Sequence, residues 1–305
     1  MKAFQTLCWI WTLVQYLKVA RVESWLGWIF SFGFGSIFLS LPPFERFLAI
    51  LFAFSLATAS IFILNQYFDR KEDRENAFKF NMPVASGRIA PRTALIFSFL
   101  LIFFCLVLIV LVYINLLSLF LIYLVFGTAY SAPPLRLKSV PVVDFVVSGI
   151  GAGFMPFLMG LELTDKLSPD ILSIMLGVVP LILLHCGGHI IQAVGDYEVD
   201  RKMGVHTFVV RYGRKNAAVV AGFMFLSAGF SPLLYSVFGL LPYRHLFMFF
   251  TLFPLSVPII KRYADVLKEP STKNVIDMQK TATKYGIIGI TVMLGYTLLL
   301  KIASF

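Results

Sequence analysis

The chain has 305 residues, of which 59% are hydrophobic and only 14% are charged. An ordinary soluble domain carries about 25% charged residues, so this chain cannot cover a water-soluble globule of its size. A mean hydropathy of +0.85 and long unbroken apolar runs exclude a disordered chain and an outer-membrane barrel, whose strands alternate. The composition therefore predicts an all-α integral membrane protein.

The apolar segments give the expected order of elements along the chain. The first, about 4–17, is short and contains two glutamines, so we expect a helix lying at the membrane interface. Nine further segments are interpreted as transmembrane helices, since about 20 apolar residues span a bilayer. Their approximate bounds are 24–41, 47–68, 93–113, 116–131, 140–161, 171–193, 215–238, 243–260 and 284–302. We therefore predict one domain, 1–305, with about nine transmembrane helices.

Positive charges are unevenly divided between the two ends of these predicted spans. With the N-terminus on side one, 22 of the 26 lysines and arginines fall on that side. The exceptions are Arg46, Lys166, Arg244 and Lys301. Positive loops stay on the cytoplasmic side, so the net charge of +10 reflects orientation in the membrane rather than nucleic-acid binding. We expect a multi-pass cell-membrane protein with cap loops on its cytoplasmic side.

Seven of the 16 acidic residues fall in two short windows, each with a polar residue and two aspartates at steps of four. The two ladders are Asn65, Asp69 and Asp73, and Gln192, Asp196 and Asp200. Such steps place side chains on one helix face. Anions at the C-terminal end of a helix cost roughly 0.3–1 kcal/mol each, so we expect a cation to compensate. Carboxylate and amide oxygens suit Mg²⁺, with Asp69, Asp73, Asp196 and Asp200 as the metal ligands.

The ladders occupy equivalent places in the two halves of the chain. Each ends the second span of its half, about 20–138 and about 139–262, which indicates a weak internal repeat. Because both spans end on the cytoplasmic side, the ladders can face each other at the same depth. A single ladder would be explained equally well as a solvated helix end, but the matched pair favours a shared site.

Basic and aromatic residues follow the fourth span, in YSAPPLRLK, where the proline pair must end the helix. Tyr130 is left near the membrane end, and bases beyond it can donate to a metal-bridged phosphate. The bases expected to bind diphosphate are Arg21, Arg88, Arg136, Lys138 and Lys202. The alternative is an interfacial tyrosine followed by ordinary cytoplasmic charges, some of them salt-bridge partners or lipid contacts.

Three further polar residues lie within apolar segments. Asp144, in the fifth span, is either a functional carboxylate or one half of a structural ion pair. His185 and His189 are four residues apart on the sixth span. We expect them to be packed polar residues facing a cavity rather than zinc ligands, because no HExxH pattern surrounds them.

A metal-bridged diphosphate at the mouth of an apolar chamber is the arrangement that a lipid diphosphate requires. An allylic diphosphate ionises when metal ions and bases stabilise the departing group. We expect Asp69 and Asp196 to be catalytic through the metal, and Tyr130 to face the allylic carbon or the bridging oxygen. The alternative class is a divalent-cation transporter or channel, although its acids would then lie along a path through the membrane rather than at one face.

The segments NQYFDRKED, YSAPPLRLK and GDYEVDRKMG, in this order, resemble the UbiA superfamily of intramembrane prenyltransferases. The resemblance implies nine transmembrane helices around a central cavity, and Mg²⁺ with diphosphate on the two ladders, Asn65 included. It also implies diphosphate contacts for Arg21, Arg88 and Lys138, with Tyr130 near the reacting carbon. The chain departs from common family patterns in NMPVASGR, at Gln192 and at Pro134.

These observations predict a Mg²⁺-dependent prenyltransferase. Its partners would be an isoprenyl diphosphate donor, the lipid bilayer and a hydrophobic acceptor. We expect an aromatic, quinone-type acceptor from the family resemblance alone. A prenylated glycerol phosphate, as in archaeal-type ether lipids, and a tetrapyrrole are the alternatives.

Overall fold

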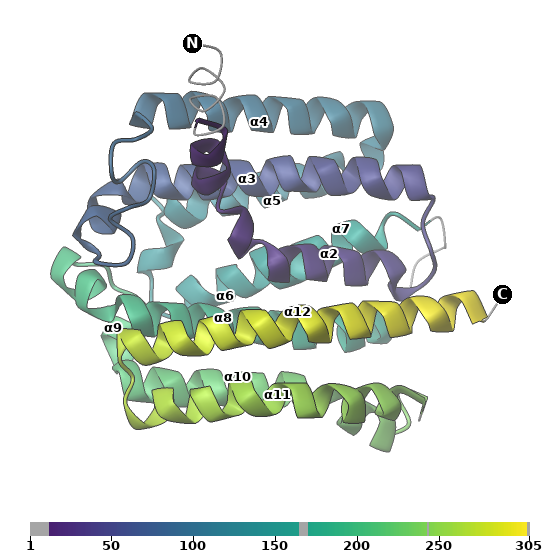
Figure 1. Cartoon of the computed structure of the whole chain (residues 1–305). Helices are drawn as coiled ribbons and strands as arrows, with labels where there is room; N and C mark the ends of the chain where they lie inside the picture. The colour runs from purple at the N-terminus through teal and green to yellow at the C-terminus, as the bar shows by residue number, and fades with distance from the viewer. Residues whose placement is uncertain (1–11, 165–169, 243, 304–305) are drawn as a thin grey trace, which may run out of the picture. The chain divides into compact units, whose positions relative to one another are not determined.

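The computed structural model describes residues 12–164, 170–242 and 244–303, and within these ranges all regular structure is helical (Figure 1). The helices α2 to α12 are connected by short loops and by 3₁₀ and π-helical turns. The chain divides into two compact units. Unit 1 comprises 1–26 and 44–137, and unit 2 comprises 27–43 and 138–305. The prediction of an all-α protein is confirmed.

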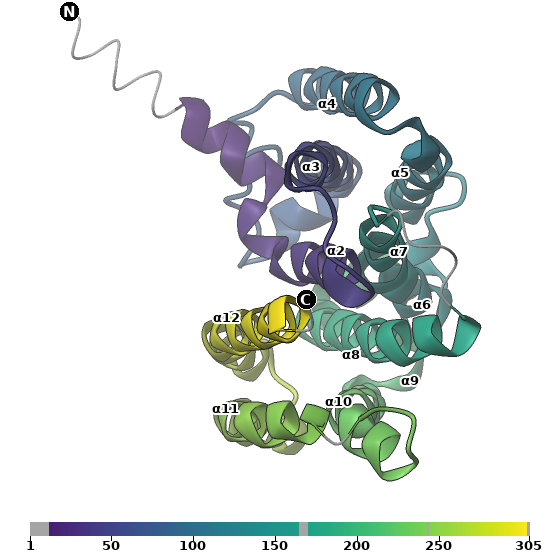
Figure 2. The ribbon, with the colours of Figure 1, turned by 90° about the vertical axis from the view of Figure 1, so that its right-hand side faces the viewer.

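Unit 1 is built around one long helix, α3 (Phe44–Glu75). The helices α4 (Pro91–Val112) and α5 (Leu117–Ser131) pack against it, as Figure 2 shows. Residues 12–20 are also helical. The predicted interfacial helix of about 4–17 therefore overlaps a helix from residue 12 onward, while its first part lies outside the described residues. Gln66 on α3 donates to the Val19 carbonyl at 2.8 Å and so connects this segment to the long helix.

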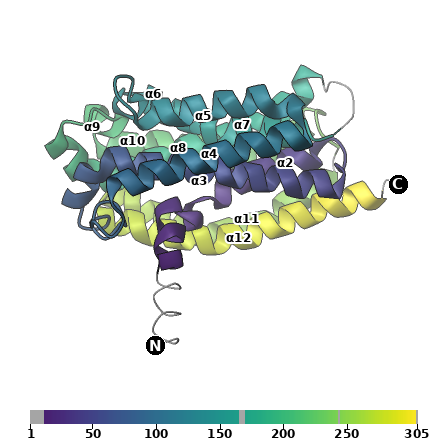
Figure 3. The ribbon, with the colours of Figure 1, turned by 90° about the horizontal axis from the view of Figure 1, so that it is seen from above.

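Unit 2 is organised around α8, which contacts α6, α9, α10 and α12. α11 and α12 pack against each other, and α12 covers much of α11 when the chain is seen from above (Figure 3). The helices of this unit are α2 (Leu26–Phe38), α6 (Val143–Gly149), α7 (Met155–Leu161), α8 (Ile171–Met203), α9 (Phe208–Tyr212), α10 (Arg214–Val237), α11 (Arg244–Lys268) and α12 (Thr272–Ala303). A π-helical turn, Ile150–Phe154, joins α6 to α7. Asp170 caps the start of α8 by accepting from the Ser173 N–H at 2.8 Å.

Glycines allow helices of unit 2 to approach closely. A Cβ on Gly35 would lie 2.1 Å from the Phe157 carbonyl oxygen, and one on Gly160 would lie 2.1 Å from the Phe32 carbonyl oxygen. α2 and α7 therefore meet backbone to backbone, the type of contact that small residues permit between helices in lipid. Gly149 on α6 permits a further close approach, since a Cβ there would lie 2.4 Å from Cys186 Sγ on α8.

Seven helical segments of the described chain are long and apolar enough to cross a bilayer. The predicted nine segments all fall on helices. Seven of them correspond to these segments, and the other two fall on α2, which has only 13 residues, and on α11. The longest helices also continue beyond their apolar parts: α3 extends to Glu75 and α8 to Met203. Both extensions carry the acidic ladders, so the ladders are helical as predicted.

Candidate active site

The first ladder lies on the last turns of α3 and is largely removed from solvent. Asp69 is 6% exposed and Asp73 is 8% exposed. Burial of two carboxylates at a spacing of four residues is unfavourable unless positive charge or hydrogen-bond donors compensate. The site therefore depends on which groups surround these side chains.

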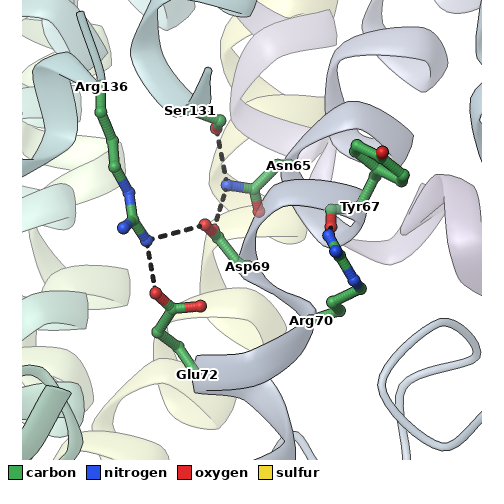
Figure 4. A network of polar contacts seen from close by, with 7 residues as sticks. All are labelled: Asn65, Tyr67, Asp69, Arg70, Glu72, Ser131 and Arg136. Atoms are coloured by element: carbon green, nitrogen blue, oxygen red, sulfur yellow. Dashed lines mark hydrogen bonds and ion pairs between the residues drawn. The ribbon is translucent and has the colours of Figure 1, made fainter. Parts of the chain in front are cut away.

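Asn65 begins the ladder, and its orientation follows from its neighbours. Its Nδ2 donates to Asp69 Oδ2 at 2.6 Å and to Ser131 Oγ at 2.9 Å (Figure 4). An ionised carboxylate only accepts hydrogen bonds, so the amide nitrogen and not the oxygen must face Asp69. This orientation leaves the amide oxygen of Asn65 available to a further donor or a cation.

Arg136 supplies the countercharge to the first ladder. Its Nη2 donates to Glu72 Oε1 at 2.7 Å and lies 3.5 Å from Asp69 Oδ1 (Figure 4). Partial burial disfavours the charged guanidinium, but the Glu72 hydrogen bond and the charges of Glu72 and Asp69 outweigh it and raise the pKa of Arg136. Arg136 therefore stays charged, and a charged guanidinium can bind phosphate oxygens. Its backbone is left-handed, with φ 35°, and its N–H donates to the Ala132 carbonyl at 2.9 Å.

The second ladder lies at the end of α8, in unit 2. Asp196 and Asp200 are both partly exposed. The helix ends at Gly204, whose φ of 69° lets the chain turn back so that the Val205 N–H reaches the Asp200 carbonyl at 2.8 Å. Lys202 is exposed in the last turn. Because the two ladders belong to different units, their convergence stays a prediction.

The remaining predicted residues occupy loops and helix ends. Arg21 has a left-handed backbone, with φ 52°, and its guanidinium lies 5.5 Å from the centre of the Phe62 ring. Arg88 is exposed; it donates to Ser86 Oγ at 2.9 Å and to the Asn81 carbonyl, and so organises the loop after α3. Tyr130 is half-buried in the last turn of α5, and Lys138 is half-buried in a 3₁₀ turn, Leu137–Ser139.

Two residues that contact this site were not predicted from the sequence motifs. Glu72 lies between two ladder positions and binds Arg136, and Ser131 follows Tyr130 and binds Asn65. Both stand inside segments already identified by motif. Ladder spacing alone does not identify them, because each acts on a residue more than sixty positions away.

The polar residues within the spans have structural partners. Asp144 is 1% exposed, and its Oδ2 accepts the Phe208 N–H at 2.7 Å. In the described part of the chain, the partner of Asp144 Oδ2 is thus a backbone N–H. His185 Nε2 lies 3.1 Å from Ser31 Oγ, connecting α8 to α2.

The donor set of the first ladder suits Mg²⁺. Two buried carboxylates and an oriented amide oxygen are hard ligands, and a neighbouring guanidinium can bind phosphate oxygens beside them. Among the described residues no three His, Cys, Asp or Glu side chains gather at one point. Ladder residues four apart are about 6 Å apart along the axis, so a cation here would complete its coordination with diphosphate oxygens or water.

The sequence pattern of the UbiA prenyltransferase family matches residues 26–283. The chain belongs to this family. It is a prenyltransferase and a multi-pass integral membrane protein, as the motifs predicted. The matched region contains both ladders and the segment from Tyr130 to Lys138.

Curated relatives extend this result. The chain is 29% identical over 228 residues to the lycopene elongase/hydratase of Haloarcula japonica, covering 72% of this chain and 74% of that protein. It is 32% identical over 165 residues to the 2-acylphloroglucinol 4-prenyltransferase, chloroplastic, of Humulus lupulus, covering 52% of this chain and 39% of that protein. Apart from the Haloarcula japonica protein, the chain spans 49% or less of the curated relatives described by these comparisons.

The fold agrees with a solved UbiA structure. A UbiA homolog from Archaeoglobus fulgidus, solved with GPP and Mg²⁺, superimposes with a TM-score of 0.68 at 20% identity, covering 94% of this chain and 99% of that chain. The predicted UbiA fold is therefore confirmed.

Proposed function

We propose that this UbiA-family protein transfers an isoprenyl group from a prenyl diphosphate to a hydrophobic acceptor that enters from the membrane, and that it requires Mg²⁺. The observation that carries the proposal is the Asn65–Asp69–Asp73 ladder, with its two buried aspartates and Arg136 beside it. The Archaeoglobus fulgidus homolog with GPP and Mg²⁺ supports this choice of donor and metal.

In this proposal both ladders contribute ligands for Mg²⁺. Asp69 and Asp73 from unit 1, with Asp196 and Asp200 from unit 2, would hold Mg²⁺, and Asn65 would add its amide oxygen. When bound, the metal supplies Lewis-acid stabilisation of the diphosphate leaving group. Arg136, Lys138 and Lys202 would donate to diphosphate oxygens, as would Arg21 and Arg88. Tyr130 would face the reacting carbon.

Two substitutions test the ladders directly. Purified protein should release diphosphate from a prenyl diphosphate only when Mg²⁺ is present. Asp69→Ala and Asp196→Ala should each lower the turnover number at least about 100-fold, since each removes part of the charge stabilisation of the leaving group. Glu45→Ala, an exposed acid at the opposite end of α3, is the matched control. Full turnover by either aspartate variant would overturn the proposal.

For the acceptor, we propose an aromatic compound of the quinone-precursor type. The hop prenyltransferase and the probable homogentisate phytyltransferase 2 of rice, both matched over about half of this chain, support this class. Incubation with a prenyl diphosphate and a hydroxybenzoate, a naphthoate or homogentisate should yield a product heavier by the prenyl group. Mass spectrometry of the extracted lipids provides the measurement.

A polyene acceptor is the second candidate. It is favoured by the longer match to the Haloarcula japonica lycopene elongase/hydratase, which extends over 228 residues. The same assay with lycopene in detergent micelles distinguishes the two. If lycopene is prenylated and the aromatic compounds do not react, the acceptor is a polyene rather than an aromatic compound. The proposed donor and metal would be unaffected by that result.

A further inference from the structure

Arg136 is held in place chiefly by Glu72. One terminal nitrogen, Nη2, makes both acidic contacts, at 2.7 Å to Glu72 Oε1 and at 3.5 Å to Asp69 Oδ1 (Figure 4). Hydrogen bonds from N–H to oxygen usually span about 2.7–3.2 Å, so the Glu72 contact is a hydrogen bond and the Asp69 contact is longer than one. The Glu72 contact therefore sets the position of the guanidinium. Of the two acidic contacts of Nη2, the one with Asp69 is therefore the weaker.

The guanidinium also carries a donor that the protein leaves unused. Among the described residues, Arg136 Nε is buried and has no hydrogen-bond partner. A buried unsatisfied donor costs about 1–3 kcal/mol, more when charged, and native proteins rarely retain one without a reason. An anionic oxygen of a bound ligand is the natural acceptor, because guanidinium groups pair well with phosphate.

Glu72 is a poor candidate for metal coordination itself. It departs from the four-residue steps of the ladder, and its Oε1 is already engaged by Arg136. Its side chain is 17% exposed and that of Arg136 is 29% exposed. An ion pair of this kind is weak evidence for stability, so orientation of Arg136 is the better explanation of the contact.

We propose that Glu72 is a positioning residue: it holds Arg136 so that the Nε–H is presented to the diphosphate, and it keeps the guanidinium from closing onto Asp69. This inference deepens the proposed function and rests on it. In this arrangement the ladder aspartates on α3 would bind the metal, and Arg136, which follows α5, would contribute the anion contact.

The test compares Glu72→Ala, Glu72→Gln, Arg136→Ala and the Glu72→Ala/Arg136→Ala double variant. Two quantities are measured with saturating Mg²⁺: the KM for a prenyl diphosphate and the inhibition constant of inorganic pyrophosphate. Glu72→Ala should raise both by roughly tenfold, the loss expected for one hydrogen bond to a charged group. Glu72→Gln keeps an acceptor oxygen and should recover most of this loss.

The double variant separates positioning from other roles. If Glu72 acts through Arg136, the double variant should bind pyrophosphate no more weakly than Arg136→Ala alone. Additive losses, or wild-type constants in Glu72→Ala, would overturn the inference. Glu45→Ala serves again as the matched control on α3. If Glu72→Ala fails to fold, Glu72→Asp withdraws the carboxylate by one methylene and should change both constants in the same direction; wild-type constants there would also overturn the inference.

The outcomes also separate this inference from the proposed function. Wild-type protein that neither binds pyrophosphate nor releases it from a prenyl diphosphate with Mg²⁺ would overturn both. Wild-type protein that is active, with a Glu72→Ala variant indistinguishable from it, would overturn only the role of Glu72.

Discussion

At the scale of single residues, the orientation of Asn65 depends on a serine from another helix. Ser131 is 1% exposed and accepts from the Asn65 amide at 2.9 Å. Ser131→Ala removes one of two acceptors that direct the amide oxygen away from Asp69. We expect the Mg²⁺ concentration for half-maximal activity to rise about fivefold, because one hydrogen bond is worth about 1 kcal/mol.

Ser98→Ala is the control for this prediction. Ser98 is also fully buried in unit 1, and it donates to the Ser60 carbonyl at 3.1 Å, away from the ladder. Mg²⁺ titrations of initial rate provide the measurement. A normal Mg²⁺ requirement in Ser131→Ala would show that Asn65 is oriented without the serine.

Part of the site could be predicted from sequence because it is periodic. Steps of four on one helix identify Asn65, Asp69 and Asp73 as one face without any tertiary information. Glu72 and Ser131 could not be found in this way, since their importance depends on contacts with Arg136 and Asn65. The acceptor class was predicted from the family resemblance and not from site residues, because apolar side chains that face a chamber and those that face lipid have the same chemistry.

At the scale of elements, the close crossing of α2 and α7 gives a direct test of the packing. Gly35→Ala would place a Cβ 2.1 Å from the Phe157 carbonyl oxygen. Because both sides of this contact are backbone, we expect a destabilisation of about 1–3 kcal/mol, the usual cost of overpacking. The midpoint of thermal unfolding in detergent, followed by tryptophan fluorescence, should fall.

Gly33→Ala is the matched control on the same helix. In the described structure a Cβ at Gly33 meets no heavy atom within 4 Å. Alanine has the better helix propensity by up to about 1 kcal/mol, so the midpoint should stay constant or rise. Equal effects of the two substitutions would contradict the α2–α7 contact.

A second element-scale prediction concerns Asp144, which connects α6 to the start of α9. Its Oδ2 accepts the Phe208 N–H at 2.7 Å. The Phe208 ring packs edge-on against the Phe145 ring, with 5.2 Å between the ring centroids. Asp144→Ala would remove the acceptor of the Phe208 N–H. We expect the free energy of unfolding to fall by about 1–3 kcal/mol. Hydrogen exchange should accelerate at Phe208 and its neighbours.

Asp144→Asn distinguishes the hydrogen bond from the charge. Its amide oxygen can still accept from Phe208, so most of the stability should return. If Asp144→Asn were as unstable as Asp144→Ala, the charge of the carboxylate would be the important property, and the backbone contact would not explain the residue.

The lengths of the helices show what a hydropathy pattern does not predict. The predicted second and sixth spans end near 68 and 193, whereas α3 and α8 continue to Glu75 and Met203. A hydropathy pattern records only the part of a helix that lies in lipid. Backbone hydrogen bonding does not stop at the membrane surface, and the extra turns are those that carry the ladders.

At the scale of the whole molecule, the uneven distribution of positive charge predicts the orientation in the membrane. Of the 26 lysines and arginines, 22 fall at one end of the predicted spans. Since positive loops stay cytoplasmic, the loop after α3 and both ladders should face the cytoplasm. The loop after α7 should face the opposite side, because consecutive spans alternate in direction.

Cysteine labelling tests this orientation. With the three native cysteines replaced, Ala77→Cys lies in the exposed loop after α3, and Glu162→Cys lies in the exposed turn after α7. In intact cells a membrane-impermeant maleimide should modify Glu162→Cys and leave Ala77→Cys unmodified until the membrane is permeabilised. Activity retained by both variants would show that the labelled protein is folded. The reverse pattern would place the diphosphate-binding end outside the cell, where a cytoplasmic pool of prenyl diphosphate could not reach it.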